Sequence, residues 1–144
     1  MRLHRTALLA ALLTAATATP ASAATSAFFH TPSGNIGCAM FDKGADGVFV
    51  RCDIGEHNWP LPPRPKTQAC RELDLIGGLE LGAKGKSKFF CAGDTVLHQG
   101  SVLGYGHSKK VGRFTCTSET KGMTCRNRNN GHGLFLSRAS YRRF

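Results

Sequence analysis

The sequence lacks the short motifs that mark common hydrolases and nucleotide-binding enzymes. Its 144 residues contain no Gly-x-Ser-x-Gly nucleophile elbow, no His-Glu-x-x-His zinc motif and no glycine-rich phosphate loop. The six histidines are dispersed along the chain. These absences discount the familiar serine hydrolases, zinc proteases and P-loop nucleotidases, and they leave only loose candidates for catalysis.

Acidic residues and helical patterns are also scarce. Nine Asp and Glu face 19 Lys and Arg, which gives a formal net charge of +10. No window of about a dozen residues beyond the N-terminal stretch shows helical periodicity. The hydrophobic content of 41% against 19% charged residues still suffices for a core, which argues against a disordered chain. At roughly 100–200 residues per domain, the length allows one domain.

Long hydrophobic runs are missing, apart from a short one near the N-terminus. Two arginines precede an uncharged Ala/Leu/Thr stretch of about a dozen residues, short of the roughly 20 needed to cross a bilayer. Pro20 and the small residues Ala21-Ser22-Ala23 follow, as in a signal-peptidase site. We expect residues 1–23 to be a signal peptide, cleaved after Ala23. Residues 24–144 should then form a single secreted domain with no membrane-spanning segment.

The six cysteines form an even set without any Cys-x-x-Cys spacing. In an exported chain they should oxidise to three disulfides, and the missing spacing argues against zinc, so we expect no metal and no cofactor. Two pairs flank turn-rich segments between strand-like runs, where hairpins would bring each pair together. The predicted disulfides are Cys38–Cys52, Cys70–Cys91 and Cys116–Cys125.

Short runs rich in Phe, Val, Ile, Leu and Thr alternate with glycine and asparagine turn signals. Such runs at roughly 8–12-residue intervals are typical of antiparallel sandwiches and small barrels. We therefore predict an all-β fold, a small antiparallel sandwich or barrel built of hairpins and stabilised by three disulfides. A single helical turn is expected within Thr67–Leu75, with Thr67 as N-cap. Trp59, beside a proline-rich connector, should fold onto the core.

Basic residues concentrate in the C-terminal third. If strands align them, they would attract anionic polymers such as cell-wall phosphates, acidic glycans or nucleic acid. Nucleic-acid binding also uses interleaved aromatics, and Phe135, Tyr141 and Phe144 are nearby, but a strand position explains Phe135 equally well. Charge alone identifies no ligand. The candidate binding surface comprises Arg113, Lys121, Arg126, Arg128, Arg138 and Arg142.

Three functional interpretations remain open. The first is a monomeric, secreted, non-catalytic binding module of the cell envelope or medium, whose partner is an anionic cell-wall polymer or an extracellular protein. The second is a small secreted hydrolase or nuclease in which His132 acts as base while Arg126 and Arg138 stabilise an anionic transition state. Against it, His132 lies between two glycines and is explained by a tight turn. The third is an inhibitor of a foreign hydrolase, which suits a rigid disulfide scaffold.

Several segments of the chain together resemble a known family. They are Phe29–Cys38 (FHTPSGNIGC), Leu103–Gly106 (LGYG), Met123–Asn127 (MTCRN) and Gly131–Arg138 (GHGLFLSR), followed by Tyr141. These motifs are similar to those of a family of small secreted, six-cysteine domains of unknown function from high-GC Gram-positive bacteria. The resemblance implies export and a cysteine-paired domain, and it implies no activity and no catalytic residues.

Overall fold

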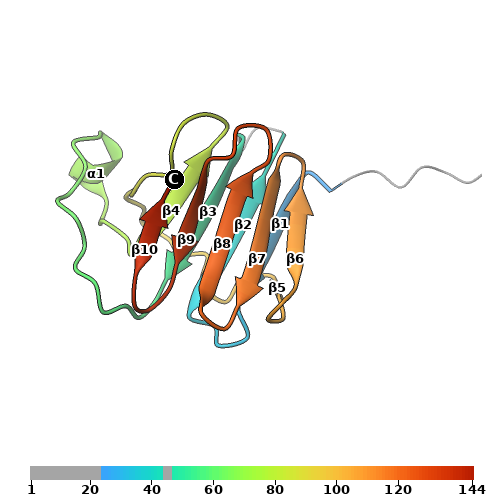
Figure 1. The fold of residues 1–144 in the computed structure, drawn as a ribbon. Helices are drawn as coiled ribbons and strands as arrows, with labels where there is room; N and C mark the ends of the chain where they lie inside the picture. The colour runs from blue at the N-terminus through green and yellow to red at the C-terminus, as the bar shows by residue number, and fades with distance from the viewer. Residues whose placement is uncertain (1–23, 44–46) are drawn as a thin grey trace, which may run out of the picture.

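The computed structural model describes residues 24–43 and 47–144. The expected signal peptide, residues 1–23, lies outside the described residues, as does part of the turn before Phe49. The described chain forms two five-stranded sheets that stack face to face (Figure 1). The all-β prediction is confirmed, and of its two forms the chain adopts the open sandwich. No helix in this part of the chain is long and apolar enough to span a membrane.

The first sheet has the strand order β4-β3-β2-β1-β5. Neighbouring strands run antiparallel, except that β1 and β5 pair in parallel over two residues. Strands β2 and β3 form a cysteine-bearing hairpin in which Cys38 lies directly opposite Cys52. The strands are β1 (Ser26–His30), β2 (Ile36–Phe41), β3 (Phe49–Ile54), β4 (Gly78–Gly82) and β5 (Ser101–Val102).

The second sheet is an antiparallel meander in the order β10-β9-β8-β7-β6. Strand β7 shows how the sequence specifies it, because Phe114, Cys116 and Ser118 are buried while the residues between them are partly exposed. This period of two gives the sheet an apolar inner face and a polar outer face. The strands are β6 (Ser108–Val111), β7 (Phe114–Glu119), β8 (Gly122–Asn127), β9 (Gly133–Leu136) and β10 (Tyr141–Arg143).

The core between the sheets contains two disulfides in contact. Cys38–Cys52 bridges β2 and β3, and Cys116–Cys125 bridges β7 and β8, with all four residues fully buried. The Sγ atoms of Cys52 and Cys125 lie 3.6 Å apart, so the two disulfides are in contact across the space between the sheets. With Cys70–Cys91 as the third bond, all three predicted pairings are confirmed and no cysteine is free. Each loop closure stabilises the fold by about 3 kcal/mol.

Residues 86–97, here called the covering segment, run from the edge of the sandwich beside β4 onto the outside of the first sheet. Lys88 and Glu80 exchange two backbone hydrogen bonds of 2.8 Å at the β4 edge. Further on, the segment crosses β2 at Gly37, where a Cβ atom would lie only 2.4 Å from the Val96 carbonyl oxygen. A side chain at that position would therefore push the segment away.

A long connection, residues 55–77, extends from one edge of the sandwich and carries α1 (Ala69–Glu72) (Figure 1). The N-cap of α1 is Gln68, one residue after the predicted Thr67, but Thr67 Oγ1 still accepts a hydrogen bond of 3.2 Å from the Cys70 amide in the first turn. Trp59 is 8% exposed, stacks on His57 with ring centroids 3.9 Å apart, and donates its indole N–H to the Ser137 carbonyl at 2.9 Å. It folds onto the core as expected, and Cys70–Cys91 links the connection to the covering segment.

Candidate functional site

The outer face of the second sheet gathers basic and hydroxyl-bearing side chains. Strand pairing places Lys110, Thr115 and Arg126 in one row across β6, β7 and β8. A neighbouring row runs through Thr117, Thr124, Phe135 and Arg142, which belong to β7, β8, β9 and β10. Because alternate residues of a strand point to the same face, these rows lie on one side of the sheet, opposite the disulfide core.

Four cations on this outer face are exposed, and none forms an ion pair with an acid among the described residues. We call these four residues the basic face. Two hollows, of about 530 and 320 Å³, open on it and share Thr124 and Arg126, and no acidic residue lines either of them. The charge is therefore available to an external anion. The basic face consists of Lys110, Arg126, Arg128 and Arg142.

Two aromatic rings support the arginines of the basic face. The Arg126 guanidinium carbon lies 4.6 Å from the centroid of the Phe144 ring, and that of Arg142 lies 5.0 Å from the Phe135 centroid. Phe135 is only 7% exposed. Cation–π attraction holds the guanidinium groups over the rings, which positions the charges and at the same time covers the ring faces.

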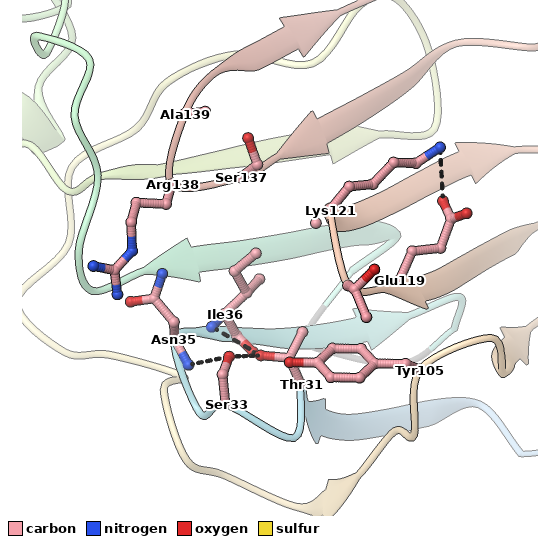
Figure 2. Close-up of a pocket in the computed structure, with 12 residues that line it drawn as sticks. Thr31, Ser33, Asn35, Ile36, Tyr105, Glu119, Lys121, Ser137, Arg138 and Ala139 are labelled. Atoms are coloured by element: carbon pink, nitrogen blue, oxygen red, sulfur yellow. Dashed lines mark hydrogen bonds and ion pairs between the residues drawn. The ribbon is translucent and has the colours of Figure 1, made fainter.

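A third hollow, here called the end cleft, opens where the two sheets end (Figure 2). Its volume is about 300 Å³, and its walls come from the turn before β2, the β7–β8 turn, the β9–β10 turn and Tyr105. Figure 2 shows the Tyr105 side chain extending toward Thr31 and Ser33. The cleft thus joins segments that are far apart in the sequence. Its side-chain lining includes Thr31, Ser33, Asn35, Ile36, Tyr105, Glu119, Lys121, Ser137 and Arg138.

The polar groups of the end cleft are held in place by bonds within the protein. Asn35 accepts the Glu56 amide at 2.8 Å through its Oδ1 and donates its Nδ2 to the Glu56 carbonyl at 3.0 Å. Arg138 pairs with the Glu56 carboxylate at 2.7 Å, and Lys121 pairs with Glu119 at 3.5 Å. These two ion pairs cancel in charge, so the end cleft is polar and close to neutral.

The opposite outer face, on the first sheet, also carries an arginine, but its charge is matched internally. Arg51 binds both oxygens of Asp53 at 2.9 Å and the Asp94 carboxylate at 2.8 Å. The hydrogen bond from Arg51 and its positive charge lower the pKa of Asp94 below its ordinary value. This cluster binds the covering segment to the sheet.

Comparison with known proteins places the chain in a family. A model described as a family of unknown function (DUF6636) matches residues 7–144. The chain belongs to this family. No curated protein and no solved structure matches it. Family membership thus defines the domain without naming an activity, and the functional argument rests on the geometry.

Segments that carry the motifs of this domain meet at the end cleft. Thr31, Ser33 and Asn35 come from the FHTPSGNIGC segment, Arg138 from the GHGLFLSR segment and Tyr105 from LGYG. These segments are separated by dozens of residues, and only the stacking of the two sheets brings them together. No local pattern in the sequence pointed to this cleft.

The six candidate basic residues do not form one surface. Arg126, Arg128 and Arg142 belong to the basic face, and Lys121 lines its larger hollow while pairing with Glu119. The remaining two are paired elsewhere, Arg113 with Asp42 at 2.6 Å and Arg138 with Glu56. Lys110 was missed as a candidate. Lys109 and Lys110 are adjacent in the sequence, and the pairing of Lys110 with Thr115 on β7 is what places Lys110 on the outer face.

His132 lies in the turn between β8 and β9 and is half-buried. Its amide donates to Asn130 Oδ1 at 3.0 Å, and its carbonyl accepts the Asn127 amide at 2.8 Å. Arg138 follows the far end of β9, whose four residues span about 13 Å. The structure therefore does not bring His132 and Arg138 together. Gly131 has a φ of 77°, which suits the turn, and a Cβ atom at Gly133 would lie only 2.4 Å from the Phe144 ring, so both glycines have a structural explanation.

Proposed function

We propose that this protein is a secreted, non-catalytic binding module of the cell envelope or medium, which holds an anionic polymer on its basic face. Three disulfides suit an oxidising compartment. The leader pattern of residues 1–23 also supports export.

One observation carries the proposal, namely four exposed cations on one open face without acidic partners among the described residues. Like charges on one face repel each other, and a solvated polyanion relieves this repulsion and releases its counterions on binding. Elsewhere in the described chain, Arg51, Arg113 and Arg138 have acidic partners within 3 Å. Single exposed cations without an acidic partner, such as Arg71 and Lys84, also occur elsewhere in the described chain, so what supports the proposal is the gathering of four such cations on one face.

The test measures binding of the oxidised protein to inorganic polyphosphate and to purified cell walls over a range of salt concentrations. We expect saturable binding that weakens as salt rises, and that the double variant Arg126→Gln/Arg142→Gln weakens roughly tenfold or more. The control, Lys84→Gln/Lys86→Gln, removes the same charge from exposed residues outside the basic face. Absence of salt-sensitive binding to both probes would falsify the proposal.

The geometry of the disulfide-linked connection 55–77 supports a second candidate function, inhibition of a foreign hydrolase. It stands away from the sandwich (Figure 1), is tied by Cys70–Cys91, and exposes Leu61 and Leu73 at 42% and 38%. A rigid exposed loop loses little entropy on entering an active site. A panel of lysozymes and proteases tests this function, and it fails if the oxidised protein slows none of them.

A further inference from the structure

The end cleft adjoins the basic face. Lys121 lines both the cleft and the 530 Å³ hollow that contains Arg126 and Arg142. A polymer lying on the basic face can therefore extend past Lys121 into the cleft without leaving the surface of the protein. The two hollows differ in chemistry, since one is cationic and the other contains paired charges, hydroxyl groups and a tyrosine.

The walls of the cleft combine an aromatic surface with fixed polar groups. Tyr105 is 40% exposed, and it faces the hydroxyl-bearing residues Thr31 and Ser33 (Figure 2). A sugar ring is amphipathic in the same way, with C–H faces that pack on an aromatic ring and hydroxyl groups that bond to amides, hydroxyls and carboxylates. The volume of about 300 Å³ suits one or two such rings.

Charge distinguishes what each hollow accepts. In the cleft, Glu119 is paired with Lys121, and Arg138 is paired with Glu56, so a neutral unit meets no unmatched charge there. On the basic face the cations have no acidic partner among the described residues. A polymer that alternates neutral and anionic units matches the end cleft and the basic face together.

Nucleic acid matches the basic face less well. Single-stranded nucleic acid gains affinity by stacking bases on aromatic rings within a basic groove. Here the rings of Phe135 and Phe144 lie under Arg142 and Arg126, so the ring faces that carry these guanidinium groups are occupied.

We infer that the end cleft is a sugar-binding subsite, and that the polymer held by the basic face is an anionic glycan whose neutral unit packs on Tyr105. The inference rests on the proposed function and deepens it, because it names the class of polymer. It assigns Tyr105 to ligand contact and Asn35 to positioning of the Glu56–Arg138 pair beside it.

The experiment compares three probes on the oxidised protein: hyaluronan oligosaccharides, in which a uronate alternates with a neutral amino sugar, polyphosphate of similar charge, and oligo(dT). We expect Tyr105→Ala to weaken hyaluronan binding roughly tenfold and to leave polyphosphate binding within about twofold. Phe28→Ala is the matched control, because Phe28 is an aromatic residue of similar exposure, 37%, on the outer face of the other sheet. It should change neither affinity.

Each outcome separates this inference from the function on which it rests. If polyphosphate binds in a salt-sensitive way but Tyr105→Ala leaves hyaluronan binding unchanged, the sugar subsite is wrong and the polyanion function stands. Equal losses for hyaluronan and polyphosphate in Tyr105→Ala also overturn the subsite. Tighter binding of oligo(dT) than of hyaluronan would identify the polymer as nucleic acid. If none of the three probes binds, both proposals fail.

Discussion

The two outer faces of the sandwich use arginine in opposite ways. On the first sheet, the Arg51 side chain is only 12% exposed and binds Asp53 and Asp94, and the covering segment lies over it. On the second sheet, Arg126 and Arg142 are exposed, lie over aromatic rings, line a hollow and form no ion pair with an acid among the described residues. The first arrangement stabilises the fold, whereas the second leaves positive charge for a ligand.

The inner faces do not show this difference. Each sheet contributes one fully buried cross-strand disulfide, and the two disulfides meet at the centre of one core. Each sheet therefore has one disulfide in the shared core, and the difference in arginine pairing belongs to the outer faces. This separation allows stability and binding to be perturbed independently.

The largest expected effect on the first sheet comes from Asp53→Ala. Asp53 is fully buried and accepts hydrogen bonds from Arg51, from Thr95 Oγ1 at 3.1 Å and from the Val96 amide at 3.0 Å. Without the Asp53 carboxylate, the largely buried Arg51 guanidinium keeps only the exposed Asp94 carboxylate as an acidic partner, and the Val96 amide loses its hydrogen-bond acceptor. The free energy of unfolding should therefore fall by about 4 kcal/mol.

Urea unfolding with the disulfides intact measures this change. Glu56→Ala is the control, because it also removes one carboxylate from an arginine, but at a site where the carboxylate is 72% exposed. It should cost no more than about 1 kcal/mol. Equal costs for the two variants would remove the distinction between structural and surface charge.

The next effect concerns the third disulfide. Cys70→Ala/Cys91→Ala opens a loop with a sequence separation of 21 and should lower the free energy of unfolding by about 3 kcal/mol. Because this bond anchors the covering segment, amide hydrogen exchange at Val96 should accelerate under native conditions. Exchange at Cys116 and Cys125 in the second sheet should stay slow. Equal acceleration in both sheets would show that the covering segment is not a separate unit.

Arg126→Gln and Arg113→Gln should have opposite effects, the first on polyphosphate affinity and the second on stability. Arg126 is exposed and unpaired among the described residues, so its loss should weaken polyphosphate binding about fivefold and leave the free energy of unfolding within about 0.5 kcal/mol. Arg113 binds Asp42, which is only 10% exposed, so its loss should lower stability and leave affinity nearly unchanged. Titration with polyphosphate and urea unfolding of both variants measure the four quantities. Parallel losses of affinity would contradict the contrast between paired and unpaired arginines.

The smallest effect is the acid titration of Asp94. Its pKa is lowered because Arg51 hydrogen-bonds to the ionised carboxylate and attracts it. The pair therefore stabilises the fold above the unfolded-state pKa, near 3.8, and this contribution disappears as pH falls through the lower folded-state pKa. Since the carboxylate is 75% exposed, the contribution is small. Carboxyl NMR should give a midpoint below 3.8, and a midpoint at or above that value would contradict the pairing.

Local patterns in the sequence predicted the cysteine hairpins well. Cys116 and Cys125 flank one short turn, and the alternation of β7 and β8 places both on the same face, so their bond needs no distant information. The barrel alternative could not be excluded in advance, because closure depends on how the edge strands of the two sheets meet. The short parallel pairing of β1 with β5 also left no local pattern.

The acidic partners of the arginines could not be predicted from the sequence. Arg51 and Asp94 are 43 residues apart, and Arg113 and Asp42 are 71 apart, so their pairing depends on the final packing. For this reason Arg113 and Arg138 were counted with the binding surface although both are paired. The end cleft could not be predicted for the same reason, because its walls come from four segments that only the final packing brings together.

The most direct test of the account compares two variants with the same net charge. One replaces Lys110, Arg126, Arg128 and Arg142 with glutamine, and the other replaces the exposed cations Lys66, Arg71, Lys84 and Lys86. The measurement is the slope of log Kd for polyphosphate against log salt concentration. The account predicts that the slope falls by roughly 0.7 for each residue lost from the basic face and changes little in the second variant. Equal reductions in the two variants would show that net charge, and not the basic face, binds the polymer.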